Sequence, residues 1–136
     1  MSKLYFVPGV FLLAGLVAAM WYVQRPAQAS PEIIAFAKCL RDKGITMYGA
    51  DWCSHCQNEK AAFGTAFRFV PYVECPKEPK RCLAEGIDAY PTWIFPNPSE
   101  ATSLGGAEHG GRRLVGEQGI PKLSQEAGCP LPSSKN

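Results

Sequence analysis

The stretch Gly49-Ala50-Asp51-Trp52-Cys53-Ser54-His55-Cys56-Gln57 decides the fold that we expect. The four residues before it, Ile45-Thr46-Met47-Tyr48, predict a short buried strand. The residues from Cys53 to about Phe69 have apolar side chains at helical spacing. Two cysteines three positions apart at the start of a helix can form a disulfide with little backbone movement.

The rest of the chain places this motif in an α/β protein. We expect a helix from Ser30 to Lys43, because Ser30-Pro31-Glu32 has the residue preferences of a helix start and Gly44 those of a stop. Further elements are expected, in order, as a strand at 70–73 with Pro71 at an edge or strand start, a helix at 80–86, strands at 92–95 and 113–115, and a helix at 121–127. This order predicts a mixed central sheet flanked by helices. A strand that leads into a Cys-x-x-Cys at a helix start is typical of the thioredoxin fold.

The chemistry expected of the motif is thiol–disulfide exchange. Cys53 would lie beside unpaired backbone N–H groups at the positive end of the helix dipole, which stabilises a thiolate. His55 can add a positive charge or a hydrogen bond to that thiolate, so the disulfide becomes a stronger oxidant. Cys53 is therefore the predicted attacking sulfur and Cys56 the resolving one. A structural zinc half-site, a copper site using Cys53, His55 and Cys56, and an inert disulfide are the alternatives.

Tyr90-Pro91-Thr92 is the second candidate site segment. In a thioredoxin-like layout the Tyr90–Pro91 bond would be cis and would face the cysteine pair, and the Tyr90 backbone would bind an extended substrate. The alternative is an ordinary proline at a strand start. Trp52 is expected to pack beside the active site and to contribute to substrate binding. Asp51 is either a proton acceptor for Cys56 or an exposed turn acid, and Glu59 and Lys60 are expected on a surface helix face.

The N-terminal segment from Leu4 to Val23 contains 20 residues without a charge, enough to span a bilayer as a helix. Two interpretations compete. The segment is a signal-anchor with Trp21 and Tyr22 at the interface, or a signal peptide that is removed after the Ala27-Gln28-Ala29 site. We therefore divide the chain into residues 1–29 (anchor or signal with linker), 30–129 (thioredoxin-like domain) and 130–136 (flexible tail).

Length, charge and cysteine content exclude several classes of function. About 100 residues suffice for one compact core and not for two. Of 14 Lys and Arg residues, Lys3 and Arg25 flank the apolar segment, which leaves 12 against 12 acidic residues and no basic stripe for nucleic acid. No cofactor-binding motif is present. Six cysteines, all beyond residue 30, favour an oxidising compartment, so we expect the domain to be extracytoplasmic.

Four further cysteines lie outside the motif. Cys39 falls on the first helix of the domain and Cys129 just after the last, so either a bridge that closes a 90-residue loop or two separate thiols is compatible with the pattern. The Gly-rich segment from Pro96 to Gly111 is expected to be a flexible loop in which His109 is solvated.

Several motifs resemble one thioredoxin-like family, which is fused to or encoded beside vitamin K epoxide reductase-like quinone reductases in bacteria and plastids. The similar stretches are Lys38-Cys39-Leu40, 47–57, Phe63-Gly64, 71–75, Gly86-Ile87, 90–93 and Gly116-Glu117-Gln118. The resemblance implies a domain that passes electrons from newly exported proteins to a membrane reductase and thence to quinone, in the bacterial periplasm or the thylakoid lumen. It also relates Cys75 and Cys82 to the family's second pair, as a structural disulfide or as a second redox pair.

The sequence departs from the family in architecture, because it holds one candidate membrane segment and no four-helix reductase. We therefore expect quinone chemistry to reside in another chain or to be absent. The opposite direction of electron flow, a reductase or isomerase fed by a membrane donor, stays open at this stage.

Overall fold

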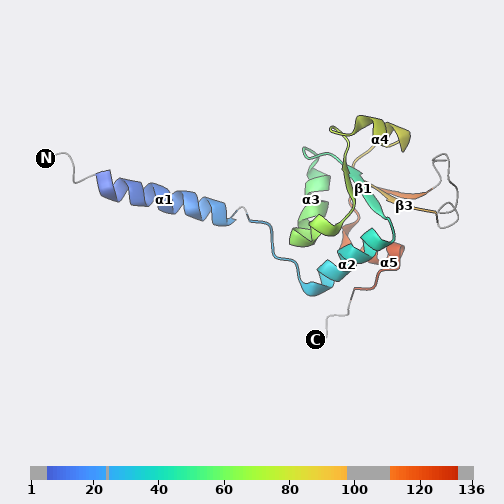
Figure 1. Ribbon diagram of the computed structural model, residues 1–136, viewed down its shortest axis with the longest axis horizontal. Coiled ribbons are helices and arrows are strands. Elements are labelled where there is room, and N and C mark those ends of the chain that lie inside the picture. Colours follow the sequence, from blue (N-terminus) through green and yellow to red (C-terminus); the bar gives the residue numbers. More distant parts are fainter. Residues whose placement is uncertain (1–5, 24, 98–110, 132–136) are drawn as a thin grey trace.

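The computed structural model describes residues 6–23, 25–97 and 111–131, and its centre is a four-stranded mixed sheet (Figure 1). The strands are β1 (Thr46–Gly49), β2 (Tyr72–Glu74), β3 (Thr92–Phe95) and β4 (Arg112–Val115), in the order β2-β1-β3-β4. β1 pairs parallel with β2 and antiparallel with β3, and β3 pairs antiparallel with β4. The predicted mixed sheet is confirmed, and Pro71 precedes an edge strand.

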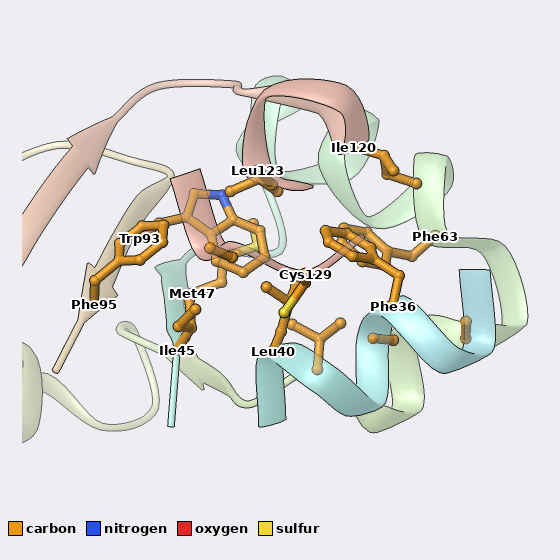
Figure 2. Packing of buried hydrophobic residues seen from close by; sticks show 14 of the residues in the cluster. Phe36, Leu40, Ile45, Met47, Phe63, Trp93, Phe95, Ile120, Leu123 and Cys129 are labelled. Atoms are coloured by element: carbon orange, nitrogen blue, oxygen red, sulfur yellow. The ribbon is translucent and has the colours of Figure 1, made fainter. Parts of the chain in front are cut away.

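Helices cover both faces of the sheet. The main core lies between one face and the helices α2 (Pro31–Asp42), α3 (Ser54–Phe63) and α5 (Gly119–Ala127). Figure 2 shows Trp93 and Met47 of the sheet packed toward Phe36, Phe63 and Leu123 of these helices. A smaller cluster on the other face joins the sheet to α4 (Pro79–Ala84) and contains Tyr48, Val73, Cys75 and Cys82. This α/β arrangement agrees with the thioredoxin-like fold expected from the sequence.

The first helix of the domain begins where the sequence predicts. The Ser30 hydroxyl accepts a hydrogen bond from the Ile33 N–H at 3.4 Å, and Pro31 occupies the first helical position. The buried face of α2 is formed by Phe36, Ala37 and Leu40. A capped amphipathic helix of this kind is determined by local sequence, which explains the agreement.

The predicted continuous helix from Cys53 to Phe69 is wrong at Gly64. There α3 ends, and a 3-10 helix, η1 (Gly64–Phe69), follows. Gly64 has a φ of +52°, and a Cβ on it would lie 2.3 Å from the Ala27 carbonyl oxygen. That oxygen accepts from the Thr65 N–H at 3.0 Å, and the Ala29 N–H donates to the Thr65 hydroxyl at 3.0 Å. The segment before α2 is therefore bound to the domain at the end of α3 opposite the cysteine pair.

Helix α1 (Phe6–Val23) extends away from the domain in Figure 1. Its side chains from Val10 to Val23 are exposed and uncharged. Within the residues that the structure describes, no helix combines the length and the hydropathy needed to cross a membrane. The expectations for Leu4 and Tyr5, for residues 98–110 with His109, and for the tail at 132–136 lie outside the described residues.

Candidate active site

The first turn of α3 holds Cys53 at the surface of the domain. Cys53 is the N-cap residue, with extended backbone and no side-chain cap, so its sulfur lies beside the unpaired N–H groups of the helix start. Its own N–H donates to the Ala50 carbonyl at 3.1 Å, which fixes the turn. The Cys53 thiol donates to the Tyr90 carbonyl oxygen at 3.8 Å. This half-buried sulfur is accessible to an incoming thiol.

Cys56 lies one turn further along α3 and is fully buried, with 0 % of its surface exposed. Its sulfur packs against Gly49 of β1, where an added Cβ would come within 2.8 Å of it. Burial raises the pKa of the Cys56 thiol to about 12. Both cysteines are thiols in this structure. The pair therefore consists of one approachable sulfur and one buried sulfur, and the attacking role of Cys53 and the resolving role of Cys56 stay predictions.

The Tyr90–Pro91 peptide bond is cis, as the sequence predicts, and it lies opposite Cys53. Pro91 is buried, and its carbonyl oxygen accepts from the Gly116 N–H at 2.7 Å. Trp52 is 72 % exposed, and its ring meets the Tyr90 ring edge-on at a centroid distance of 6.0 Å. The exposed Trp52 and the half-buried Tyr90 thus form an aromatic surface next to the Cys53 sulfur.

His55 points to a partner that the sequence reasoning did not identify. Its Nδ1 lies 3.0 Å from Glu117 Oε2, and the Asn58 amide donates to the same oxygen at 3.1 Å. These hydrogen bonds lower the pKa of the Glu117 carboxyl. Among the described residues no hydrogen bond joins His55 to Cys53. The Gly116-Glu117-Gln118 stretch was visible among the family motifs, but nothing local indicated that it contacts His55.

Glu59 corrects the expectation of a surface helix face. It is 1 % exposed, and its carboxylate accepts from the N–H groups of Gln118 at 2.9 Å and Gly119 at 3.2 Å. Burial raises the pKa of Glu59, and the two backbone hydrogen bonds act in the opposite direction. The position was misjudged because its partners lie about 60 residues away. The one available signal was its spacing of three from Cys56, which places both on one helix face.

Asp51 is an exposed acid engaged with two lysines. Its carboxylate lies 2.7 Å from Lys60 Nζ and 3.5 Å from Lys77 Nζ. The hydrogen bond from Lys60 is the main reason why the pKa of Asp51 is lowered. The Asp51 N–H in turn donates to Glu74 at 2.9 Å, and the Tyr72 hydroxyl donates to the other oxygen of that carboxylate. This hydrogen-bonded network therefore joins the turn before Cys53 to β2 through Glu74.

The remaining four cysteines form two disulfides. Cys39 of α2 is bonded to Cys129, and Cys75 at the end of β2 is bonded to Cys82 of α4. Cys75 and Cys82 are 3 % and 4 % exposed, and Cys129 is 0 % exposed. An attacking thiolate must reach a disulfide sulfur, so these three buried cysteines are poorly placed for exchange, whereas Cys39 is half-buried. Over the described part of the chain, no group of three or more His, Cys, Asp or Glu side chains is arranged to hold a metal ion.

Comparison with known proteins places this site in a context. No family model matches the chain. It is 43 % identical over 78 residues to the thiol-disulfide oxidoreductase LTO1 of Arabidopsis thaliana, an alignment that covers 51 % of this chain and 21 % of the plant protein. The match thus spans about a fifth of that relative's length. The chain is therefore homologous to a thiol-disulfide oxidoreductase, which confirms the family resemblance seen in its motifs.

Proposed function

We propose that the protein is a thiol:disulfide oxidoreductase that donates the Cys53–Cys56 disulfide to proteins with free thiols. The observation that carries the proposal is the unequal exposure of the two sulfurs. Cys53 lies at the surface of a helix start, 3.8 Å from the Tyr90 carbonyl, and Cys56 is buried beneath it. The homologous protein's name describes the same chemistry.

The proposed cycle starts with the oxidised pair. A substrate thiolate attacks the Cys53 sulfur, so the Cys53–Cys56 bond breaks, a mixed disulfide forms, and Cys56 leaves as a thiolate and takes up a proton. The raised pKa of Cys56 favours this protonation. The substrate's second thiolate then attacks its own mixed-disulfide sulfur and releases Cys53. In total the substrate loses two electrons and two protons, and the enzyme gains them.

The substrate would bind along Tyr90-Pro91, with Trp52 as an adjoining aromatic contact. The exposed Trp52 ring meets the half-buried Tyr90 ring edge-on, and an extended segment bound along the Tyr90 backbone would bring its thiol to Cys53. The chemistry requires only an accessible cysteine on the substrate. This surface therefore suits unfolded or newly exported proteins with little sequence selection.

Reoxidation is assigned to a partner. By the family resemblance, a vitamin K epoxide reductase-like quinone reductase in the membrane accepts the two electrons. The apolar segment from Leu4 to Val23 would hold the domain at the extracytoplasmic face of that membrane, or would be removed after Ala29. A tether would raise the effective concentration of the partner. Alkaline extraction of membranes and the N-terminal sequence of the isolated protein test this part.

The experiment that tests the function has two readouts. The first is the reduction potential of the Cys53–Cys56 pair in glutathione buffers, where strong oxidants and isomerases lie at about −120 to −180 mV and thioredoxin at about −270 mV. The second is the oxidation of a reduced, unfolded protein by stoichiometric oxidised enzyme. We expect a potential in the upper range and transfer of one disulfide per enzyme. A potential near −270 mV would instead assign a reductase fed by a membrane donor.

The copper or zinc alternative uses the same residues, so it needs its own measurement. Metal content after purification, with and without a thiol reductant, separates the two readings. A stoichiometric metal that protects Cys53 and Cys56 from alkylation would favour the metal-binding module. Full alkylation with no bound metal supports the redox proposal.

A further inference from the structure

We propose that Glu117 is a positioning residue that holds His55 and limits how strongly this histidine stabilises the Cys53 thiolate. The inference rests on the proposed function, since it concerns the same exchange reaction, and it names the residue that sets its driving force. In this view Glu117 acts on Cys53 only through His55. The carboxylate itself does not touch the reacting sulfur.

The contact between the two residues is direct. Glu117 Oε2 lies 3.0 Å from His55 Nδ1 and also accepts from the Asn58 amide at 3.1 Å. Both partners are on α3, three residues apart, so one carboxylate spans the first turn of the helix. With Nδ1 occupied by Glu117, only Nε2 of the ring is free to face a thiolate or a substrate.

The backbone that carries Glu117 is held on both sides. Before it, the Gly116 N–H donates to the carbonyl oxygen of Pro91 at 2.7 Å. After it, the buried Glu59 carboxylate accepts from Gln118 and Gly119. Glu59 belongs to α3 and Pro91 adjoins Cys53, so the segment is fixed to both parts of the active site. Glu117 therefore reaches His55 from a constrained position, although its side chain is partly exposed.

The electrostatic consequence follows from this geometry. A positive imidazolium two residues from Cys53 stabilises a thiolate there, and a stabilised thiolate favours the reduced pair. A carboxylate 3.0 Å from the ring cancels part of that positive field. Because the pair is exposed, solvent screens the interaction and the effect is moderate. Removing the negative charge while the histidine is protonated should therefore make the disulfide more oxidising.

The test uses the full chain and four forms of it: wild type, Glu117→Gln, His55→Gln and the double variant. Glutamine keeps a hydrogen-bond acceptor for His55 and removes only the charge. Each form is equilibrated with glutathione at pH 6.0, and the reduced fraction is counted by alkylation and mass. Glu32→Gln, which removes one exposed carboxylate at the start of α2, is the matched control.

We expect Glu117→Gln to raise the equilibrium constant for reduction by glutathione roughly three- to tenfold, where tenfold corresponds to about 30 mV. Alkylation of Cys53 at the same pH should quicken in parallel. In the His55→Gln background the Glu117 substitution should leave the equilibrium constant unchanged. Glu32→Gln should leave it unchanged both in wild type and in the His55→Gln background. An unchanged or lowered constant in Glu117→Gln overturns the proposal, as does an effect that persists without His55.

This outcome is separate from that of the proposed function. The glutathione equilibrium reports the thiolate whichever way electrons flow to substrates. If wild-type enzyme fails to oxidise a reduced protein while Glu117→Gln still shifts the equilibrium through His55, the disulfide-donor assignment falls and the positioning role stands. If transfer proceeds but the Glu117 variants match wild type, the disulfide-donor assignment stands and the positioning role of Glu117 falls.

Discussion

Three cysteine pairs share one small domain, and the contrast between them shows what makes a disulfide reactive. Cys53 and Cys56 lie at a helix start, with one sulfur half-exposed and the other buried. In the Cys75–Cys82 bond both cysteines are buried, and in the Cys39–Cys129 bond Cys129 is buried and Cys39, in the second half of α2, is half-buried. Sequence spacing distinguishes the reactive pair from the two disulfides less clearly, because Cys75 and Cys82 are also near neighbours in sequence. Exposure of one sulfur at a helix N-terminus is therefore the distinguishing property.

The second difference lies in what surrounds the sulfurs. Cys53 is next to a carbonyl, a partly exposed aromatic surface and a histidine–carboxylate pair. The Cys75–Cys82 disulfide is packed against Tyr48 and Val73 in the smaller hydrophobic cluster. Apolar surroundings disfavour a thiolate and exclude an attacking one. This contrast favours a structural role over the second redox role for Cys75 and Cys82.

The largest effect is expected from replacing the cysteines of the reactive pair. Cys53→Ser should abolish disulfide transfer to a reduced protein, because Cys56 is buried and the other four cysteines are held in disulfides. Cys56→Ser should instead accumulate substrates bound covalently to Cys53, visible as adducts on non-reducing gels. Cys53→Ser should change the free energy of unfolding little because the residue is half-exposed, whereas Cys56→Ser places a hydroxyl in the core and should lower that free energy by about 1 to 3 kcal/mol. If both variants retain full transfer activity, the active site has been assigned to the wrong residues.

The next effect should come from the Cys39–Cys129 disulfide, which joins residues 90 apart. Replacing both cysteines with serine should lower the free energy of unfolding by about 4 to 5 kcal/mol in the chain-entropy model. Guanidinium unfolding followed by tryptophan fluorescence measures this loss. The reduction potential of Cys53–Cys56, measured under conditions where the variant is folded, should not change. A shifted potential would show that this disulfide communicates with the active site.

A smaller loss is expected for Cys75–Cys82, because it closes a loop of only 7 residues. The same model gives about 2 to 3 kcal/mol for the double serine variant. The sharper readout is function, since a relay role would make this variant fail in multiple turnovers with the proposed membrane partner while single turnovers continue. We expect both rates to stay within about twofold of wild type. Selective loss of the multiple-turnover rate would restore the second redox role.

The sequence was sufficient for features that depend on local signals. Ser30-Pro31 marks the start of α2, and the strand–CxxC–helix order predicts the fold around Cys53. The cis bond before Pro91 was expected from the same layout. In each case the determining residues are neighbours in sequence, so their pattern contains the information.

Features that the sequence did not reveal depend on distant segments. The helix break at Gly64 exists because Ala27, 37 residues earlier, brings its carbonyl to that point. Glu59 is buried because the N–H groups of Gln118 and Gly119 need an acceptor. His55 meets Glu117 across 62 residues. Such pairings exist only once the fold is assembled. The spacing of a polar residue along a helix does not tell whether that face of the helix is solvated or buried, so the sequence alone could not reveal them.

The smallest expected effect concerns pH and tests the burial of Glu59. Its native pKa is raised, so the folded protein holds this proton more tightly than the unfolded chain. The stability from Glu59 is then fully present below the unfolded glutamate pKa and is lost as pH rises through the native value. The advantage of wild type over Glu59→Gln in free energy of unfolding should therefore shrink as the pH rises above the ordinary glutamate pKa.

Glu32→Gln supplies a control of opposite sign. The pKa of Glu32 is lowered by its hydrogen bond with Ser30, so its contribution is present above the unfolded pKa and is lost as pH falls. The advantage of wild type over Glu32→Gln should therefore grow as pH rises through the acid range. Denaturant unfolding at matched pH values gives both differences in one series. If the advantage of wild type changes with pH in the same direction for both variants, Glu59 ionises as an exposed acid does. In that case its carboxylate does not hold the Gln118–Gly119 backbone from a buried position.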